Sequence, residues 1–182
     1  SGFIRHSVVG YKNVDRLKSK LREYGAVFLK SEEVLTLPEQ IDVPIRVNST
    51  RDYAWFKRDY IVETTKASTI EGVELVGDTV LKRMLHLRQL AAMYNPFKYA
   101  ALRDLMESTS DRLILFYNFK SEYEQVKELC QQLERPISSV NGEGRDLKAF
   151  DECSDSITLI QYKAGAMGLN LQKANKIIYF SP

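Results

Sequence analysis

Cysteine and histidine are scarce in this sequence of 182 residues. The two cysteines, Cys130 and Cys153, are far apart and have no histidine near them, so the pattern fits neither a zinc cluster nor a disulfide framework. His6 and His86 are also far apart, and no nucleophile has a credible partner nearby in the sequence. We therefore expect a reduced intracellular protein with no metal site and no catalytic residue of its own.

The sequence also lacks an excess of charge and any long apolar run. Its 26 Lys and Arg against 24 Asp and Glu leave a net charge of +2, so a basic surface for nucleic acid would have to be local. No stretch approaches the length that spans a bilayer, and the first ten residues lack the apolar core of a signal peptide. We expect a cytoplasmic protein that does not contact a membrane.

Two glycine-rich nucleotide-binding signatures are missing as well. Neither GxxxxGK followed by Ser or Thr nor GxGxxG occurs in the sequence. The chain therefore has no Walker loop and no dinucleotide fingerprint of its own.

The sequence has two parts with different patterns of apolar residues, and the pattern changes near residue 110. Apolar residues recur at helical spacing from Asn13 to about Ser110, and from Asp111 onward short apolar runs alternate with amphipathic or glycine-bearing segments. Within the first part, after Gly25, Pro38 and Pro44 predict an extended connector or edge strand, because proline removes a backbone donor.

Four helices are predicted in the first part. The first runs from Val14 to Tyr24 and stops at Gly25. The second begins after Ser49, which forms a capping box with Asp52. Its predicted apolar side comprises Tyr53, Phe56, Tyr60 and Ile61.

The third and fourth helices carry their own start signals. Asp78 is predicted to cap the third, and Asn95 followed by Pro96 opens the fourth, which continues through Met106. The residues of the third helix predicted to point inward are Leu81, Met84, Leu85 and Met93.

The second part predicts an open parallel α/β sheet with right-handed crossovers. Strands are expected at 112–117, 136–140, 156–161 and 176–180, and the first is a short continuous apolar run, typical of a strand covered on both faces. Ser121 and Glu124 are predicted to cap a helix that ends before Pro136. A short helix at 147–150 follows the turn at Asn141 and Gly142.

Three loops of this sheet are expected to meet at one working edge. The carboxyl ends of parallel strands share an edge, so the segments after Tyr117, Val140 and Gln161 should converge. Gly165 and Gly168 would let backbone amides approach a phosphate, and Lys163 adds a point charge. From their spacing alone, a tight turn between two buried strands explains the two glycines somewhat better than a phosphate site does. The neighbouring polar residues favour a phosphate backbone: Asn118, Lys120, Asn141 and Gly142.

These residues resemble a known family. "AGAMGLNLQKANKIIYFSP", preceded by "SITLIQ", is similar to motif V and the following strand in the second RecA-like lobe of Swi/Snf-type helicases of superfamily two. "RLILFYNF" resembles motif IV, and "VNGEG" resembles the turn after the next strand. Upstream, "LHLRQLAAMYNPFKYAALRDLM" resembles the segment before motif IV, and "EEVLTLPEQIDVPIRV" the exit from the first lobe. The sequence of these motifs is most similar to that of short helicases of bacteriophages and prophages.

The resemblance implies a division of the chain. Residues 1–48 would be the tail of the first lobe and a connector, 49–110 a helical insert, and 111–182 a second RecA-like lobe (helicase C-terminal domain) that stops before motif VI. The fold class implied is α/β: an incomplete parallel-sheet RecA-like lobe preceded by a helical segment. The Walker loop, the acidic metal-binding motif and the motif VI arginines would lie outside this chain.

The resemblance also implies site residues. Those expected to contact the DNA backbone are Asn118, Lys120, Asn141, Gly142, Gln161, Tyr162 and Lys163. Those expected to face the nucleotide are Gly165, Gly168, Leu169 and Asn170. Two positions depart from the family pattern: Tyr162 replaces a small hydroxyl residue, and Ala166 stands where glycine is frequent.

The resulting hypothesis is part of an ATP-dependent DNA helicase or translocase. ATP and magnesium would bind the full-length protein, between this lobe and the first lobe of the same chain, and neither is expected on this fragment. DNA contacts would be independent of sequence. The alternative is a non-enzymatic α/β module that binds nucleic acid or protein.

Overall fold

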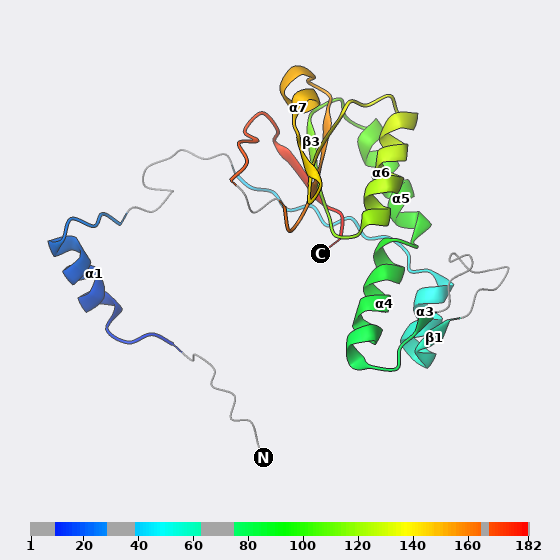
Figure 1. The fold of residues 1–182 in the computed structure, drawn as a ribbon, viewed down its shortest axis with the longest axis horizontal. Coiled ribbons are helices and arrows are strands. Elements are labelled where there is room, and N and C mark those ends of the chain that lie inside the picture. Colours follow the sequence, from blue (N-terminus) through cyan, green and yellow to red (C-terminus); the bar gives the residue numbers. More distant parts are fainter. Residues whose placement is uncertain (1–9, 29–38, 63–74, 165–167, 182) are drawn as a thin grey trace, which may run out of the picture. The chain divides into compact units, whose positions relative to one another are not determined.

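The computed structural model describes residues 10–28, 39–62, 75–164 and 168–181 (Figure 1). The chain divides into two compact units, Ser1–Pro44 and Ile45–Pro182. The predicted site residue Gly165, the neighbouring Ala166 and the proline of the predicted connector at position 38 lie outside the described residues.

The first unit contains helix α1 (Val14–Glu23), as predicted. Gly25 follows it with φ of 85°, a left-handed conformation that glycine adopts without steric cost, and its amide donates to Arg22 O at 2.9 Å. Val14, Leu17 and Leu21 form an apolar stripe, yet none of the helix residues is buried.

The second unit begins with helix α3 (Arg51–Asp59). Its N-cap is Thr50, whose hydroxyl accepts from the amide of Tyr53 at 3.3 Å, so the predicted capping box of Ser49 and Asp52 is wrong by one residue. The helix also ends sooner than predicted, because Tyr60 adopts a left-handed φ of 60°. Ile61 therefore lies in strand β1 (Ile61–Val62), which pairs antiparallel with β2 (Leu75–Val76).

Helix α4 (Val80–Ala92) presents a different side to the interior from the one predicted. Leu81, Met84 and Leu85 are 78%, 60% and 40% exposed. Leu90 is buried instead, in a cluster with Phe56. The reason is that α3 and β2 contact the other side of the helix. Met93, also predicted inward, is the C-cap and is half-buried.

Threonine caps α4 as it caps α3. The hydroxyl of Thr79 accepts from the amide of Lys82 at 3.3 Å, so Asp78 is not the cap that was predicted. Asp78 forms an ion pair with Lys82 at 2.8 Å, which spans one turn of the helix.

Helix α5 (Pro96–Glu107) begins as predicted. The side-chain oxygen of Asn95 accepts from the amide of Phe97 at 3.1 Å, and its side-chain nitrogen donates to Asn48 O at 3.0 Å. Leu102 and Met106 on this helix are buried against the sheet described next.

The remaining chain forms one five-stranded sheet in the order β5-β4-β6-β3-β7. Strands β3 (Leu113–Tyr117), β4 (Ile137–Asn141), β6 (Ile157–Gln161) and β7 (Lys176–Tyr179) are parallel. Strand β3 lies between β6 and β7. The predicted α/β class and its parallel sheet are confirmed.

One strand was missed. β5 (Gly144–Asp146) pairs antiparallel with β4, so the turn at Gly142 closes a hairpin. All three residues of β5 are exposed, and none is apolar except glycine, so the segment carries no hydrophobic run from which to predict a strand.

Two helices connect the strands. α6 (Lys120–Gln132) begins one residue before the predicted cap at Ser121. Its N-cap is Phe119, whose amide donates to the carboxylate of Glu122 at 3.0 Å, so Glu122 and not Glu124 satisfies the helix start. α7 (Lys148–Glu152) corresponds to the predicted short helix and follows β5.

The sheet has two unlike faces. On one face, α5 and α6 lie side by side (Figure 1) and bury residues such as Leu115, Leu159 and Val126 in the largest core cluster. On the other face, a smaller cluster of Ile114, Val140 and Ile160 is packed against the chain between β6 and β7. The second face is the more open one, because Ile177 and Tyr179 on β7 remain exposed.

Candidate nucleic-acid interface

The carboxyl ends of β4, β6 and β3 bring three predicted site residues to one edge of the sheet. Asn141 ends β4, Gln161 ends β6, and Asn118 follows β3. Gln161 Nε2 donates to Asn118 O at 3.4 Å, and the amide of Tyr162 donates to Tyr117 O at 3.1 Å. The register of the parallel strands thus places the loops after β3 and β6 in direct contact, with the end of β4 at the same edge.

Asn118 joins the end of β3 to the end of β7. Its side-chain Nδ2 donates to Ser181 O at 2.8 Å, and its amide donates to Ser181 Oγ at 3.2 Å and to Glu122 Oε2 at 3.0 Å. Much of its hydrogen-bonding capacity is therefore used within the protein, and its role at the edge includes holding two loops together.

Glu122 is the centre of this arrangement, although the sequence predicted a cap at Ser121 and Glu124 instead. Its side chain is fully buried, and Oε2 also accepts from Ser181 Oγ at 2.8 Å. Its other oxygen, Oε1, lies 3.8 Å from Lys98 Nζ on α5. Burial lowers the pKa of Lys98, and the charge of Glu122 opposes that shift. The sequence signal for this buried glutamate was its place at the third position of α6, where a carboxylate can accept from the N-cap amide.

The Asn141 turn lies beside the start of α6. Asn141 Oδ1 accepts from the amides of Glu143 at 2.9 Å and Gly144 at 3.2 Å, which closes the hairpin. Lys120 Nζ lies 3.5 Å from Glu143 Oε1, and both side chains are exposed. Burial raises the pKa of Tyr117 to about 12, and the neighbouring Asn141 side chain opposes that shift. The structure therefore brings together Lys120 and the predicted Asn141–Gly142 turn.

The segment after β6 contributes a cation and a glycine turn. Lys163 is exposed in a tight turn in which the amide of Ala164 donates to Gln161 O at 2.9 Å. Gly168 has φ of 59°, and a Cβ there would meet no atom within 4 Å. Leu169 packs against the smaller core cluster, whereas Asn170 is exposed.

Metal and membrane features are absent from the described ranges. Within residues 10–28, 39–62, 75–164 and 168–181, no group of three or more His, Cys, Asp or Glu is arranged to hold a metal ion. In the same residues, no helix has the length and apolar character to cross a bilayer.

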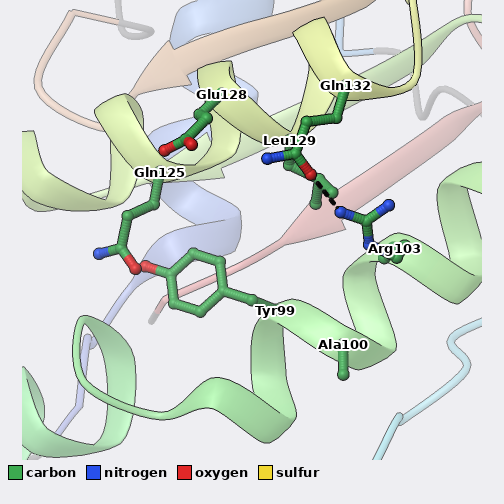
Figure 2. Close-up of a pocket in the computed structure, with 7 residues that line it drawn as sticks. All are labelled: Tyr99, Ala100, Arg103, Gln125, Glu128, Leu129 and Gln132. Atoms are coloured by element: carbon green, nitrogen blue, oxygen red, sulfur yellow. Dashed lines mark hydrogen bonds between the residues drawn. The ribbon is translucent and has the colours of Figure 1, made fainter. Parts of the chain in front are cut away.

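A pocket lies on a different part of the second unit. It measures about 250 Å³ between α5 and α6, and Figure 2 shows the hydrogen bond of Arg103 to Gln132 at one side of it. Its lining residues are Tyr99, Ala100, Arg103, Gln125, Glu128, Leu129 and Gln132. None of the predicted site residues contributes to it.

Comparison with known proteins gives limited similarity. No protein-family model and no curated protein matches the chain. Among solved structures, the chain is similar to the C-terminal part of the Fun30 ATPase domain, with a TM-score of 0.44 and 22% identity over 50% of this chain. The match spans about a third (32%) of that structure's length. Similarity at this level assigns neither activity nor residue roles.

Proposed function

We propose that this chain is part of an ATP-dependent DNA helicase or translocase of the Swi/Snf type. The sheet of the second unit serves as its second lobe and grips the DNA backbone without reading sequence. The observation that carries this proposal is the meeting of the loops after β3, β4 and β6 at one edge of a parallel sheet. Ligands of open α/β sheets bind beyond the carboxyl ends of the strands.

The local charge supports a polyanion as the ligand. Residues 156–182 contain three lysines and no Asp or Glu, although the whole chain is almost balanced. Lys163 stands at the edge itself, and it forms no ion pair with any residue that the structure describes. Phosphate contacts of this kind position a protein on DNA and give sequence-independent binding.

The same edge supplies one wall of the proposed ATP site. The open, left-handed backbone at Gly168 leaves room for a phosphate, with Leu169 and Asn170 next to it. ATP with magnesium supplies the free energy for movement along DNA. The described residues include no cluster of metal ligands, so in this proposal the first lobe holds magnesium and the phosphates.

The family resemblance supplies the setting of this proposal. The partners are DNA and the first lobe of the same motor, and the setting is the cytoplasm of a cell that hosts a phage or prophage. Neither lobe alone would carry a complete nucleotide site.

The experiment is a salt titration of DNA binding by the purified chain. We expect weak binding to unrelated duplexes with equal affinity, and an affinity that falls steeply as salt rises. Lys163→Ala should weaken binding to every sequence alike and reduce the slope of log affinity against log salt by about 1. Lys148→Ala, which removes an exposed lysine from α7 near the opposite end of the strands, is the matched control and should change neither quantity.

Two results would contradict the proposal. One is an unchanged affinity and slope in the Lys163 variant, which would leave this lysine as a solvated turn residue. The other is magnesium-dependent phosphate release by the chain alone above background, since a lobe without cradle and metal ligands should not turn over ATP. Binding to protein but not to DNA would favour the non-enzymatic module.

A further inference from the structure

Three aromatic rings form a continuous row at the carboxyl ends of β6, β3 and β7. The ring of Phe116 on β3 lies between the other two. It is stacked on Tyr179 with centroids 5.6 Å apart and planes 18° apart, and it faces Tyr162 at 5.4 Å and 31°. The rings of Phe116 and Tyr179 are therefore close to parallel, an arrangement that aromatic side chains favour when offset, and the ring of Tyr162 is tilted against Phe116.

The row ends in an open ring. Tyr179 is 66% exposed, although it belongs to a strand of the main sheet. Ile177 lies two residues earlier, and is 51% exposed. Residues two apart on a strand share a face, so these two side chains form one apolar surface beside the row. Contiguous exposed apolar surface on a folded protein frequently marks a binding site.

The charge around the row suits an anionic polymer. Lys163 directly follows Tyr162, and no acidic residue occurs from position 156 to 182. Two carboxylates that contact residues after β6 are engaged elsewhere: Glu122 is buried in its hydrogen-bond network with Ser181, and Asp111 bonds Lys176 at the other end of β7. An aromatic ring at the end of a row, with a lysine close to the row, is the combination that binds single-stranded nucleic acid.

We propose that Tyr179 stacks an unpaired base of single-stranded DNA. The base extends the row of Tyr162, Phe116 and Tyr179, while Lys163 contacts the backbone of the same strand. This inference rests on the proposed function and adds a preference for unpaired DNA. Stacking is tolerant of base identity because every base has an aromatic face, so the preference is for single strands and not for a sequence.

The test compares two oligonucleotides of equal length by fluorescence anisotropy. One carries thymine at every position, and the other is an abasic strand with the same phosphates. The wild-type chain should bind the thymine strand about tenfold more tightly, the size expected for one stacked base. Tyr179→Ala should remove this difference and leave the affinity for the abasic strand unchanged. Tyr179→Phe keeps the ring and should keep the difference.

The abasic strand separates this inference from the function on which it rests. If wild-type protein binds neither strand, the proposed function fails and the inference with it. If it binds both equally, or if Tyr179→Ala retains the difference, the inference alone is overturned. Should Tyr179→Ala lose binding to both strands by unfolding, Tyr179→Leu preserves apolar volume at the position and is expected to lose only the base-dependent part.

Two other occupants of the surface have distinct outcomes. A free nucleotide site would let thymidine monophosphate compete with the thymine strand at equal concentration, which would overturn the proposal of a polymer site. A self-contact would appear as a dimer in sedimentation that Tyr179→Ala converts to a monomer, and this too would overturn it. A monomeric chain that monophosphate does not displace from the strand supports the proposal.

Discussion

The sheet and the helical segment before it bury their apolar residues to different extents. In the sheet, Leu115 and Leu159 are fully buried under α5 and α6. In the helical segment, a small cluster around Phe56 is covered, while Leu81 and Met84 on α4 face outward. The difference indicates that the stability of the second unit resides mainly in the sheet, and that α4 presents apolar surface that this core does not use.

Shortening one apolar side chain in each region should destabilise the sheet far more than the helical segment. Leu159→Ala should reduce the free energy of unfolding by about 2–5 kcal/mol, because it leaves a cavity in a packed core. Met84→Ala, at a residue 60% exposed, should change it by less than about 0.5 kcal/mol. Urea denaturation of the two variants measures both. Equal losses of unfolding free energy in the two variants would mean that Met84 on α4 is packed as tightly as Leu159 and that the two regions do not differ.

Glu122 joins α5 to the edge of the sheet through Lys98. Glu122→Gln removes the charge that faces Lys98 and disturbs the acceptor for Ser181, so we expect a loss of about 2 kcal/mol. Glu124→Gln changes an exposed glutamate of the same helix and is the matched control. If both variants unfold at the same urea concentration, the buried network contributes nothing and α5 is held by its apolar contacts alone.

The sequence predicted the strands better than the sides of helices. Continuous apolar runs such as 113–117 are covered on both faces, so predicting the strand also predicts its burial. For α4, helical spacing permits more than one inward side, and the pairing of β1 with β2 decided between them. The spacing of apolar residues around Leu81 does not predict the pairing of β1 with β2.

Caps and site residues show a similar limit. Thr50 and Thr79 are the N-caps of α3 and α4, whereas the sequence predicted caps at Ser49 and Asp78. The prediction missed by one residue because several adjacent residues offer a suitable oxygen. The convergence of Asn118, Asn141 and Gln161 follows from strand order and could be predicted. The bond of Asn118 to Ser181 joins residues 63 positions apart and could not be predicted from local pattern.

The smallest expected effect concerns the amino edge of the sheet. Lys176 at the start of β7 hydrogen-bonds Asp111, and this bond lowers the pKa of that carboxyl from 3.8. A lowered pKa contributes stability above the ordinary pKa and loses it as pH falls through the lowered value. Wild type should therefore be slightly more stable than Asp111→Asn at neutral pH, and the difference should vanish in acid, at a pH below the lowered pKa of Asp111.

Solvent exposure keeps this contribution small and sensitive to salt. Urea midpoints at the two pH values measure it. A difference that persists unchanged in acid would show that the substitution acts on backbone structure and not through the ion pair.

The proposed DNA-binding edge is tested most directly by titrating a short duplex into isotope-labelled protein and following backbone amide resonances, which maps where DNA contacts the second unit. The largest shifts are expected at Asn118, Asn141, Gln161 and Lys163, at the carboxyl ends of β3, β4 and β6. Shifts confined to the exposed side of α4 or to the pocket between α5 and α6, with this edge unchanged, would contradict DNA binding at the carboxyl ends of the strands.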